Sequence, residues 1–112
     1  MASKIKVGIV GGAGYTGGEL IRVLLNHPLA EIIFVHSKSN ADKFLYEVHK
    51  DLHGDTSMKF ASALSQKIDV LFLCVGHGEA SKFLAANPID AKIKIIDLSQ
   101  DFRLGETTGN RK

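Results

Sequence analysis

A glycine-rich segment near the start of the chain limits most tightly how this sequence folds. Residues 11–17 read Gly-Gly-Ala-Gly-Tyr-Thr-Gly. A β-branched run at 5–10 precedes them, and from Thr16 onward leucine and isoleucine recur at helical spacing. Such a run predicts a strand buried on both faces, and the helical spacing predicts an amphipathic helix. We therefore expect a strand, a tight turn and a helix within the first 27 or so residues.

Strand-like and helix-like segments continue to alternate downstream. Three further apolar runs predict strands at 32–35, 70–75 and 93–97. The spacing over residues 80–84 predicts a helix that ends at Asn87-Pro88. A polar stretch in between predicts a short helix at 44–48 and a minor strand at 58–60. The alternation favours the α/β class, with a Rossmann-like, doubly wound, mostly parallel sheet and helices on both faces.

Length and composition narrow the class of protein. A chain of 112 residues is typical of one domain, residues 1–112. The net charge of +2 comes from interleaved acids and bases, which disfavours a nucleic acid or a membrane surface as partner. No apolar run approaches the roughly 20 residues of a membrane span, and no signal peptide is recognisable. A single cysteine excludes an internal disulfide, and we expect a cytoplasmic location.

The glycine turn carries the first functional prediction. Its spacing fits both GxGxxG and GxxGxxG, and either supplies a tight turn, close approach of the backbone to a phosphate and close packing of helix on strand. The free N–H groups at the start of the helix favour an anion. Because the motif follows a buried strand and opens a helix, we expect it to bind the pyrophosphate of a dinucleotide. The alternative is a glycine turn that only packs the helix on the sheet.

The segment after the second predicted strand bears on the choice of cofactor. NAD-binding domains usually carry an acid there for the ribose 2′-hydroxyl. This chain instead reads His36-Ser37-Lys38-Ser39, with two hydroxyls, a lysine and no carboxylate. These groups suit a 2′-phosphate and favour NADP over NAD. The alternative is a solvated polar loop.

Four segments together resemble one enzyme family. They are VGIVGGAGYTGGEL at the glycine turn, the His-x-x-Leu-x-Gly pattern at 49–54, FLCVGHG at 72–78 and IDLSQDFRL at 96–104. They are similar to segments of the N-acetyl-γ-glutamyl-phosphate reductases, in which the third reads FLALPHG and the fourth VDLSADFRL. Gly76 stands where that family usually has proline. The resemblance covers nearly all of this chain but only about the first third of such an enzyme.

The resemblance implies an NADPH-dependent reduction of N-acetyl-glutamyl phosphate to its semialdehyde, in arginine biosynthesis. The cysteine nucleophile and the histidine acid/base of such enzymes lie beyond this sequence, so no catalytic residue is expected in the chain, and the catalytic and dimerisation domain is absent from it. A homo-oligomer is expected for the full-length enzyme. Residues 107–112 look like a cut rather than a natural end.

The resemblance also implies site residues. The expected cofactor-binding residues are Gly11, Gly12, Ala13, Gly14, Tyr15, Thr16, Gly17, Ser37, Lys38, Ser39, Cys74, Val75, Gly76, His77 and Gly78. Substrate contacts are expected at Ser99, Asp101 and Arg103, since an arginine can bind a carboxylate or phosphate through two hydrogen bonds. Alternatively, Asp101 and Arg103 pair with each other.

Other features have simpler interpretations. Cys74, near the end of an apolar run, is expected to be a buried small apolar residue rather than a nucleophile. His49 and His53 share a helical spacing, but they lack the remaining ligands of a zinc site, so no metal is expected. Rival functions are an aminoadipyl-phosphate or aspartate-semialdehyde type of reductase and a non-catalytic nucleotide-binding module. If the last strand is an uncovered edge, the chain is expected to self-associate or to be marginally stable.

Overall fold

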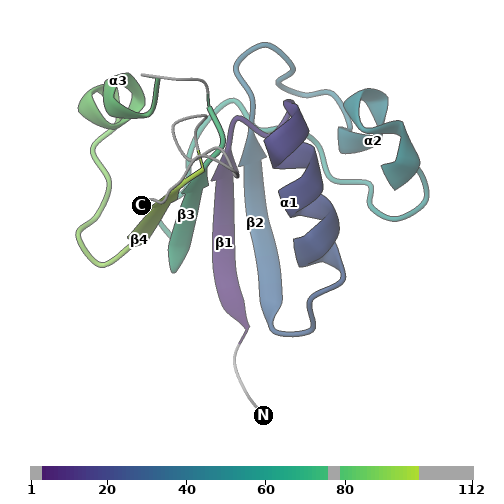
Figure 1. Ribbon diagram of the computed structural model, residues 1–112, viewed down its shortest axis with the longest axis horizontal. Helices are drawn as coiled ribbons and strands as arrows, with labels where there is room; N and C mark the ends of the chain where they lie inside the picture. Colours follow the sequence, from purple (N-terminus) through teal and green to yellow (C-terminus); the bar gives the residue numbers. More distant parts are fainter. Residues whose placement is uncertain (1–3, 76–78, 99–112) are drawn as a thin grey trace, which may run out of the picture.

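A four-stranded parallel sheet forms the centre of the computed structural model, which describes residues 4–75 and 79–98. The strands lie in the order β2-β1-β3-β4. Their bounds are Ile5–Val10 for β1, Ala30–His36 for β2, Val70–Leu73 for β3 and Lys94–Asp97 for β4. The helices are α1 at Tyr15–Leu25, α2 at Leu45–Val48, the single 3₁₀ turn η1 at Lys50–Leu52, and α3 at Glu79–Ala86. Figure 1 shows all four strands pointing in one direction.

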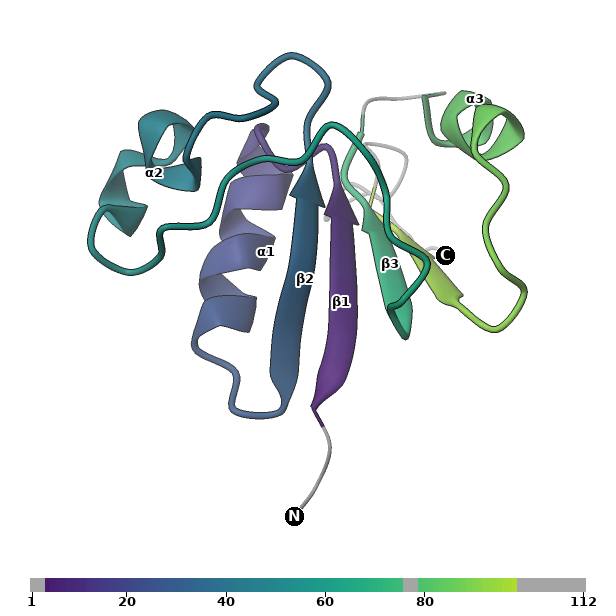
Figure 2. The same cartoon turned by 180° about the vertical axis from the view of Figure 1, so that it is seen from behind.

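Helices cover the two faces of the sheet and make two separate cores. On one face, α1 places Ile21 and Leu24 against Val7 and Ile9 of β1. On the other face, Ala80 of α3 lies in a second core with residues of β1 and β3 (Figures 1 and 2). This division follows from the alternation of side chains along a strand, which sends neighbouring residues of β1 to opposite faces. The sheet is therefore doubly wound, as the sequence predicts.

The α2–η1 segment packs beside α1 and away from the sheet centre (Figure 2). Its residues Leu45 and Leu52 are almost fully buried in the same core as α1. Arg22 of α1 donates two hydrogen bonds to the Asp51 carboxylate, from Nε at 2.5 Å and from Nη2 at 2.7 Å. A two-point pair of this kind fixes the relative orientation of the groups that it joins. The segment is thus attached to α1 by both apolar and ionic contacts.

The outer strand β4 is an exposed edge of the described sheet. Ile95 and Ile96 are 42% and 40% exposed, although a run of isoleucines is typical of a buried strand. Because consecutive residues of a strand point to opposite faces, both faces of β4 are open among the described residues. Among the described residues, the expected uncovered edge is present at β4.

Most predicted elements are confirmed, with shifts at their ends. Helix α1 begins one residue earlier than expected, and β3 ends at Leu73, two residues before the predicted 75. The expectation of a minor strand at 58–60 is wrong. Lys59 forms only an isolated bridge to Phe44, and the neighbouring Ala61 bridges to His36. Within the described part of the chain, no helix is long and apolar enough to cross a membrane.

Truncation of the α1 core contact tests this packing. We expect Ile21→Ala to lower the free energy of unfolding by about 2–5 kcal/mol, because the side chain is fully buried between helix and sheet. Val23→Ala, on the same helix but 61% exposed, should change it by less than about 0.5 kcal/mol. Urea unfolding followed by circular dichroism measures both. Equal effects of the two substitutions would contradict the described orientation of α1.

Candidate functional site

The carboxyl ends of three strands meet at one edge of the sheet. Val10, the last residue of β1, pairs with His36 on one side and with Leu73 on the other. The chain passes from β2 across to β3 at this point, so the following segments diverge and leave a crevice. Crevices at such switch points are the usual ligand sites of doubly wound sheets.

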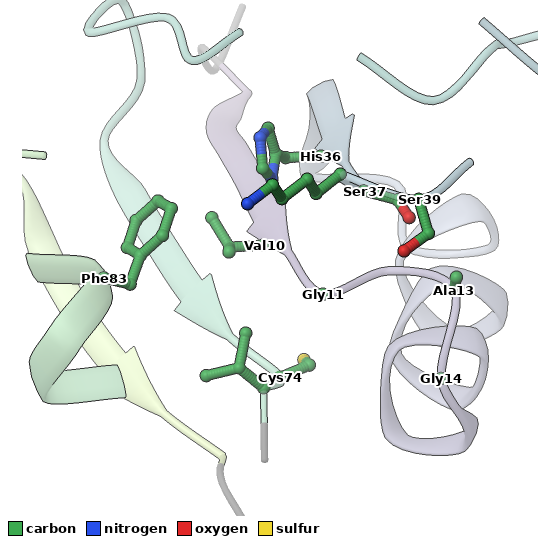
Figure 3. Close-up of a pocket in the computed structure, with 11 residues that line it drawn as sticks. Val10, Gly11, Ala13, Gly14, His36, Ser37, Ser39, Cys74 and Phe83 are labelled. Atoms are coloured by element: carbon green, nitrogen blue, oxygen red, sulfur yellow. The ribbon is translucent and has the colours of Figure 1, made fainter. Parts of the chain in front are cut away.

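The crevice holds a cavity of about 290 Å³ (Figure 3). Its lining residues are Val10, Gly11, Ala13, Gly14, His36, Ser37, Lys38, Ser39, Cys74, Val75 and Phe83. Figure 3 shows Ser37 and Ser39 over the glycine turn at Ala13, with Phe83 on the side toward α3. Eight of these eleven residues are among the predicted cofactor-binding residues. Segments that are far apart in the sequence thus meet in one cavity.

Close contacts within the protein explain three of the four glycines in the turn. Gly11 has a φ of +82°, and a Cβ there would lie 2.6 Å from the carbonyl oxygen of Cys74. A Cβ on Gly17 would lie 2.6 Å from the Gly11 carbonyl oxygen, and one on Gly12 would overlap the side chain of Val35. The Gly11 and Gly12 N–H groups both donate to the His36 carbonyl, at 3.0 and 3.2 Å. The turn is thereby held tightly against the ends of β2 and β3.

Gly14 differs from these three glycines. Its φ of −81° and ψ of 178° are extended values that any residue adopts. The nearest heavy atom to a Cβ placed there is the Gly11 carbonyl oxygen, at 4.0 Å. The protein itself therefore does not require glycine at this position. A glycine here does leave the backbone open to the cavity that it lines.

The start of α1 presents unused hydrogen-bond donors beside the cavity. Among the described residues, the N–H groups of Ala13, Tyr15, Thr16 and Gly17 have no acceptor, and the first bond of the helix runs from the Gly18 N–H to the Gly14 carbonyl. No acidic residue lies in the first turn of α1. These donors and the positive end of the helix dipole suit an anionic oxygen such as that of a pyrophosphate.

The loop after β2 divides its polar groups between structure and cavity. Ser37 is only 6% exposed, and its Oγ accepts hydrogen bonds from the backbone and side-chain amide groups of Asn40, at 3.3 and 3.4 Å. Lys38 and Ser39 are exposed at the cavity, and none of the lining residues is acidic. Ser37 therefore shapes the loop, while Lys38 and Ser39 face the ligand space.

A second cavity, of about 440 Å³, adjoins the first and shares His36, Lys38, Val75 and Phe83 with it. It adds Lys82 and Glu79 of α3, which are 3.7 Å apart. The His36 and Phe83 rings lie 6.0 Å apart between their centroids. Burial lowers the pKa of His36, partly offset by a hydrogen bond with the Ser62 backbone. The sequence analysis did not link α3 with this site, although a helix that follows the third strand must begin at the same edge of the sheet.

Cys74 lies at the cavity as a half-buried, neutral side chain. Burial raises its pKa to about 11, and the nearby Asp97 carboxylate acts in the same direction. A thiol in this state is a poor nucleophile at neutral pH. The interpretation of Cys74 as a small apolar residue agrees with this environment, and its position beside Gly11 places it in the cavity wall.

Some predicted site residues lie outside the described residues. They are Gly76, His77 and Gly78 of the predicted cofactor site, and Ser99, Asp101 and Arg103 of the predicted substrate site. Their roles stay predictions.

His49 has a contact that the sequence analysis missed. Its ring is buried, and Nε2 lies 2.6 Å from the Gly12 carbonyl oxygen. His53 instead contacts the Tyr46 ring edge-on, with centroids 4.8 Å apart. In the described ranges, no three potential metal ligands come together. The pattern His-x-x-Leu-x-Gly was the only sequence signal in this segment. It does not indicate that His49 contacts the Gly12 carbonyl.

Comparison with known proteins identifies the family. The model described as "Semialdehyde dehydrogenase, NAD binding domain" matches residues 6–108. The chain belongs to this family. It is 53% identical over 100 residues to an N-acetyl-gamma-glutamyl-phosphate reductase of Christiangramia forsetii, and 52% identical over 101 residues to one of Bacteroides thetaiotaomicron. Each match covers 89% of this chain and 31% of the relative, so the chain spans about a third of the length of these curated relatives.

A solved structure supports the fold. The crystal structure of aspartate semialdehyde dehydrogenase with NADP from Candida albicans matches with a TM-score of 0.67 at 18% identity, over 92% of this chain and 32% of that chain. The predicted Rossmann-like fold and the predicted resemblance to the N-acetyl-γ-glutamyl-phosphate reductases are both confirmed. By family, residues 6–108 are therefore the NAD-binding domain of a semialdehyde dehydrogenase.

The four glycines of the turn predict unequal responses to added side chains. Gly17→Ala should lower the free energy of unfolding by about 1–3 kcal/mol despite the better helix propensity of alanine, because its Cβ meets the backbone of the turn. Gly14→Ala should cost less than about 1 kcal/mol, since open space surrounds its Cβ. Thermal and urea unfolding of the two variants measure the difference. A reversed order would show that the turn has another conformation.

The raised pKa of Cys74 predicts slow alkylation. When the pKa rises from its ordinary value of 9.0 to about 11, the fraction of thiolate at pH 8 falls about 100-fold. Iodoacetamide should therefore react with the folded chain about 100 times more slowly than with the urea-unfolded chain. Because the folded state holds the thiol in its neutral form, Cys74 contributes to the stability of the fold below pH 9. This contribution to stability is lost as the pH rises through 11. A fast reaction at pH 8 would contradict the description of Cys74 as a neutral, buried thiol.

Proposed function

We propose that this chain is the NADP-binding part of an N-acetyl-γ-glutamyl-phosphate reductase. In the full-length enzyme it would hold NADPH for the reduction of N-acetyl-glutamyl phosphate to the semialdehyde, in arginine biosynthesis. The similarity to curated relatives of that name supports the proposal, and so does the cavity at the switch point of the sheet. The chain alone, proposed as the truncated N-terminal domain 1–112, would bind cofactor without catalysing the reaction.

The observation that carries the proposal is the open space at Gly14. The fold explains the glycines at 11, 12 and 17 by contacts within the protein, but Gly14 has an ordinary backbone conformation and no close neighbour. Free N–H groups surround this space. A pyrophosphate placed there would accept hydrogen bonds from these donors, and a side chain at position 14 would obstruct it. A turn that served packing alone would not need this glycine.

The proposed roles of the residues follow from their positions. The turn at 11–17 would bind the pyrophosphate, and Lys38 and Ser39 would bind the 2′-phosphate of NADP, since the cavity offers a cation and a hydroxyl but no carboxylate. Cys74 and Val75 would border the cofactor on its way to the nicotinamide. Substrate contacts at Ser99, Asp101 and Arg103 complete the proposed site. When bound, NADPH supplies the hydride.

The setting of the parent enzyme is part of the same proposal. We place it in the cytoplasm as a homo-oligomer, acting on a small molecule with neither a nucleic acid nor a membrane as partner. The single cysteine and the small net charge support this assignment.

Calorimetric titration of the 112-residue chain with NADP⁺ and with NAD⁺ tests the proposal. We expect NADP⁺ to bind more tightly than NAD⁺, and Gly14→Val to abolish binding of both while the circular dichroism spectrum is retained. A folded wild-type chain that binds neither dinucleotide would overturn the proposed function.

A second titration tests the 2′-phosphate contact. Lys38→Gln should weaken NADP⁺ binding by about tenfold or more and leave NAD⁺ binding nearly unchanged, because a charge-assisted hydrogen bond to phosphate is lost. Lys94→Gln is the matched control, since Lys94 begins β4 at the opposite end of the sheet from the cavity. Equal losses for the two cofactors in the Lys38 variant would refute the assignment.

A further inference from the structure

Among the described residues, the side chain of His49 has one hydrogen-bond partner, which belongs to the glycine turn at 11–17. The residue lies between α2 and η1, is 8% exposed, and places Nε2 2.6 Å from the Gly12 carbonyl oxygen. The ring also fills the space beside Gly18, where a Cβ would lie 2.6 Å from Cε1. The contact joins residues 37 positions apart in the sequence.

The chemistry of the contact determines its direction. A backbone carbonyl only accepts hydrogen bonds, so Nε2 carries the proton and donates it to Gly12. The carbonyl of Gly12 and the N–H of Ala13 belong to one planar trans peptide, in which the two groups point in opposite directions. Holding the Gly12 carbonyl toward the buried ring therefore aims the Ala13 N–H away from it. Ala13 lines the cavity, and its N–H has no acceptor among the described residues.

Other hydrogen bonds make this peptide the adjustable part of the turn. The N–H groups of Gly11 and Gly12 both donate to the His36 carbonyl and are not free for a ligand. The Ala13 N–H is the next donor along the chain, ahead of the donors of the helix. Without a partner, the buried Gly12 carbonyl would gain by rotating toward another donor, and the planar peptide would then turn the Ala13 N–H with it.

The ring itself is held from both sides. Leu45 and Leu52, before and after it, are almost fully buried in the core. The Phe60 ring lies 6.3 Å from the His49 ring between centroids. His49 is therefore a fixed donor, since its backbone cannot follow a movement of the turn.

We propose that His49 is a positioning residue for dinucleotide binding, which acts by fixing the Gly12–Ala13 peptide with the Ala13 N–H directed at the pyrophosphate. The proposal rests on the proposed function of the turn at 11–17 as the pyrophosphate site. His49 does not touch the ligand itself. Its effect is on the geometry of a donor before the ligand arrives, which lowers the cost of binding.

Two amide substitutions separate this role from simple packing. The side-chain nitrogen of glutamine can occupy the position of Nε2, whereas that of asparagine is too short to reach the Gly12 carbonyl. In titrations with NADP⁺ we expect His49→Gln to bind within about threefold of wild type and His49→Asn to bind at least tenfold more weakly, at a temperature where both are folded. Equal affinities of the two variants would overturn the proposal.

A matched control loosens the same segment without touching the turn. Asp51→Ala removes the pair with Arg22, and we expect it to lower the melting temperature while leaving the NADP⁺ affinity within about twofold of wild type. A loss of affinity in Asp51→Ala as large as in His49→Asn would assign the effect to general loosening and overturn the positioning role.

Nuclear magnetic resonance supplies a readout that does not depend on the variants folding. In the wild-type chain the Ala13 amide proton should shift downfield when NADP⁺ is added, as its N–H gains an anionic acceptor. An unchanged Ala13 signal with NADP⁺ bound would overturn the proposal and leave the proposed function intact. A wild-type chain that does not bind NADP⁺ would instead refute the proposed function.

Discussion

The structure depends on how closely the glycine turn lies against the ends of two strands. The His36 carbonyl accepts both N–H groups of Gly11 and Gly12, and the Cys74 N–H donates to the Val10 carbonyl at 2.8 Å. Close contacts with Cys74, with Val35 and within the turn leave no room for side chains at Gly11, Gly12 and Gly17. The bonds to His36 use the first donors of the turn and leave the following ones free, at the positive end of α1. A requirement of packing thereby produces a site with the character of an anion receptor.

The loop after β2, at residues 37–39, contributes both charge and shape to the cavity. The Ser37 hydroxyl oxygen accepts hydrogen bonds from Asn40 at the base of the loop, while Lys38 and Ser39 are exposed. No carboxylate lines the cavity, which removes the group that would repel a 2′-phosphate. Cys74 completes the opposite wall as an uncharged thiol. The cavity is therefore suited to bind an anionic cofactor, and its only cysteine is unsuited to act as a nucleophile.

The exposure of the outer strand β4 and the greater length of the curated relatives both bear on how this edge of the sheet is covered. Ile95 and Ile96 of β4 are about as exposed as surface residues, on both faces of the strand. The curated relatives are about three times as long as this chain. An apolar edge strand of this kind is favourable only when further elements cover it or when it pairs with another chain. Among the described residues, the β4 edge is therefore uncovered, whereas α1 covers the sheet beside the glycine turn.

The sequence by itself determined the order of elements, the parallel class of sheet and the position of the turn, because periodicity and glycine spacing are local properties of the chain. It also singled out residues 36–39, since residues just after a buried strand of a parallel sheet lie at its carboxyl edge. The family resemblance singled out 74–78, of which the structure describes 74 and 75 at the same edge. It failed at 58–60, where an isolated bridge replaces a strand, because that pairing depends on a contact with a distant segment.

Only the tertiary structure decided which polar atoms meet. It placed His49 at the Gly12 carbonyl, Asn40 at the Ser37 hydroxyl, and Lys82 of α3 in the same cavity as Lys38. It also showed that the packing of the protein requires glycine at positions 11, 12 and 17 but not at position 14. The reason is that hydrogen bonds and close contacts between distant segments depend on distances of a few ångströms, which are set by the packing of the whole domain and leave no periodic trace in the sequence.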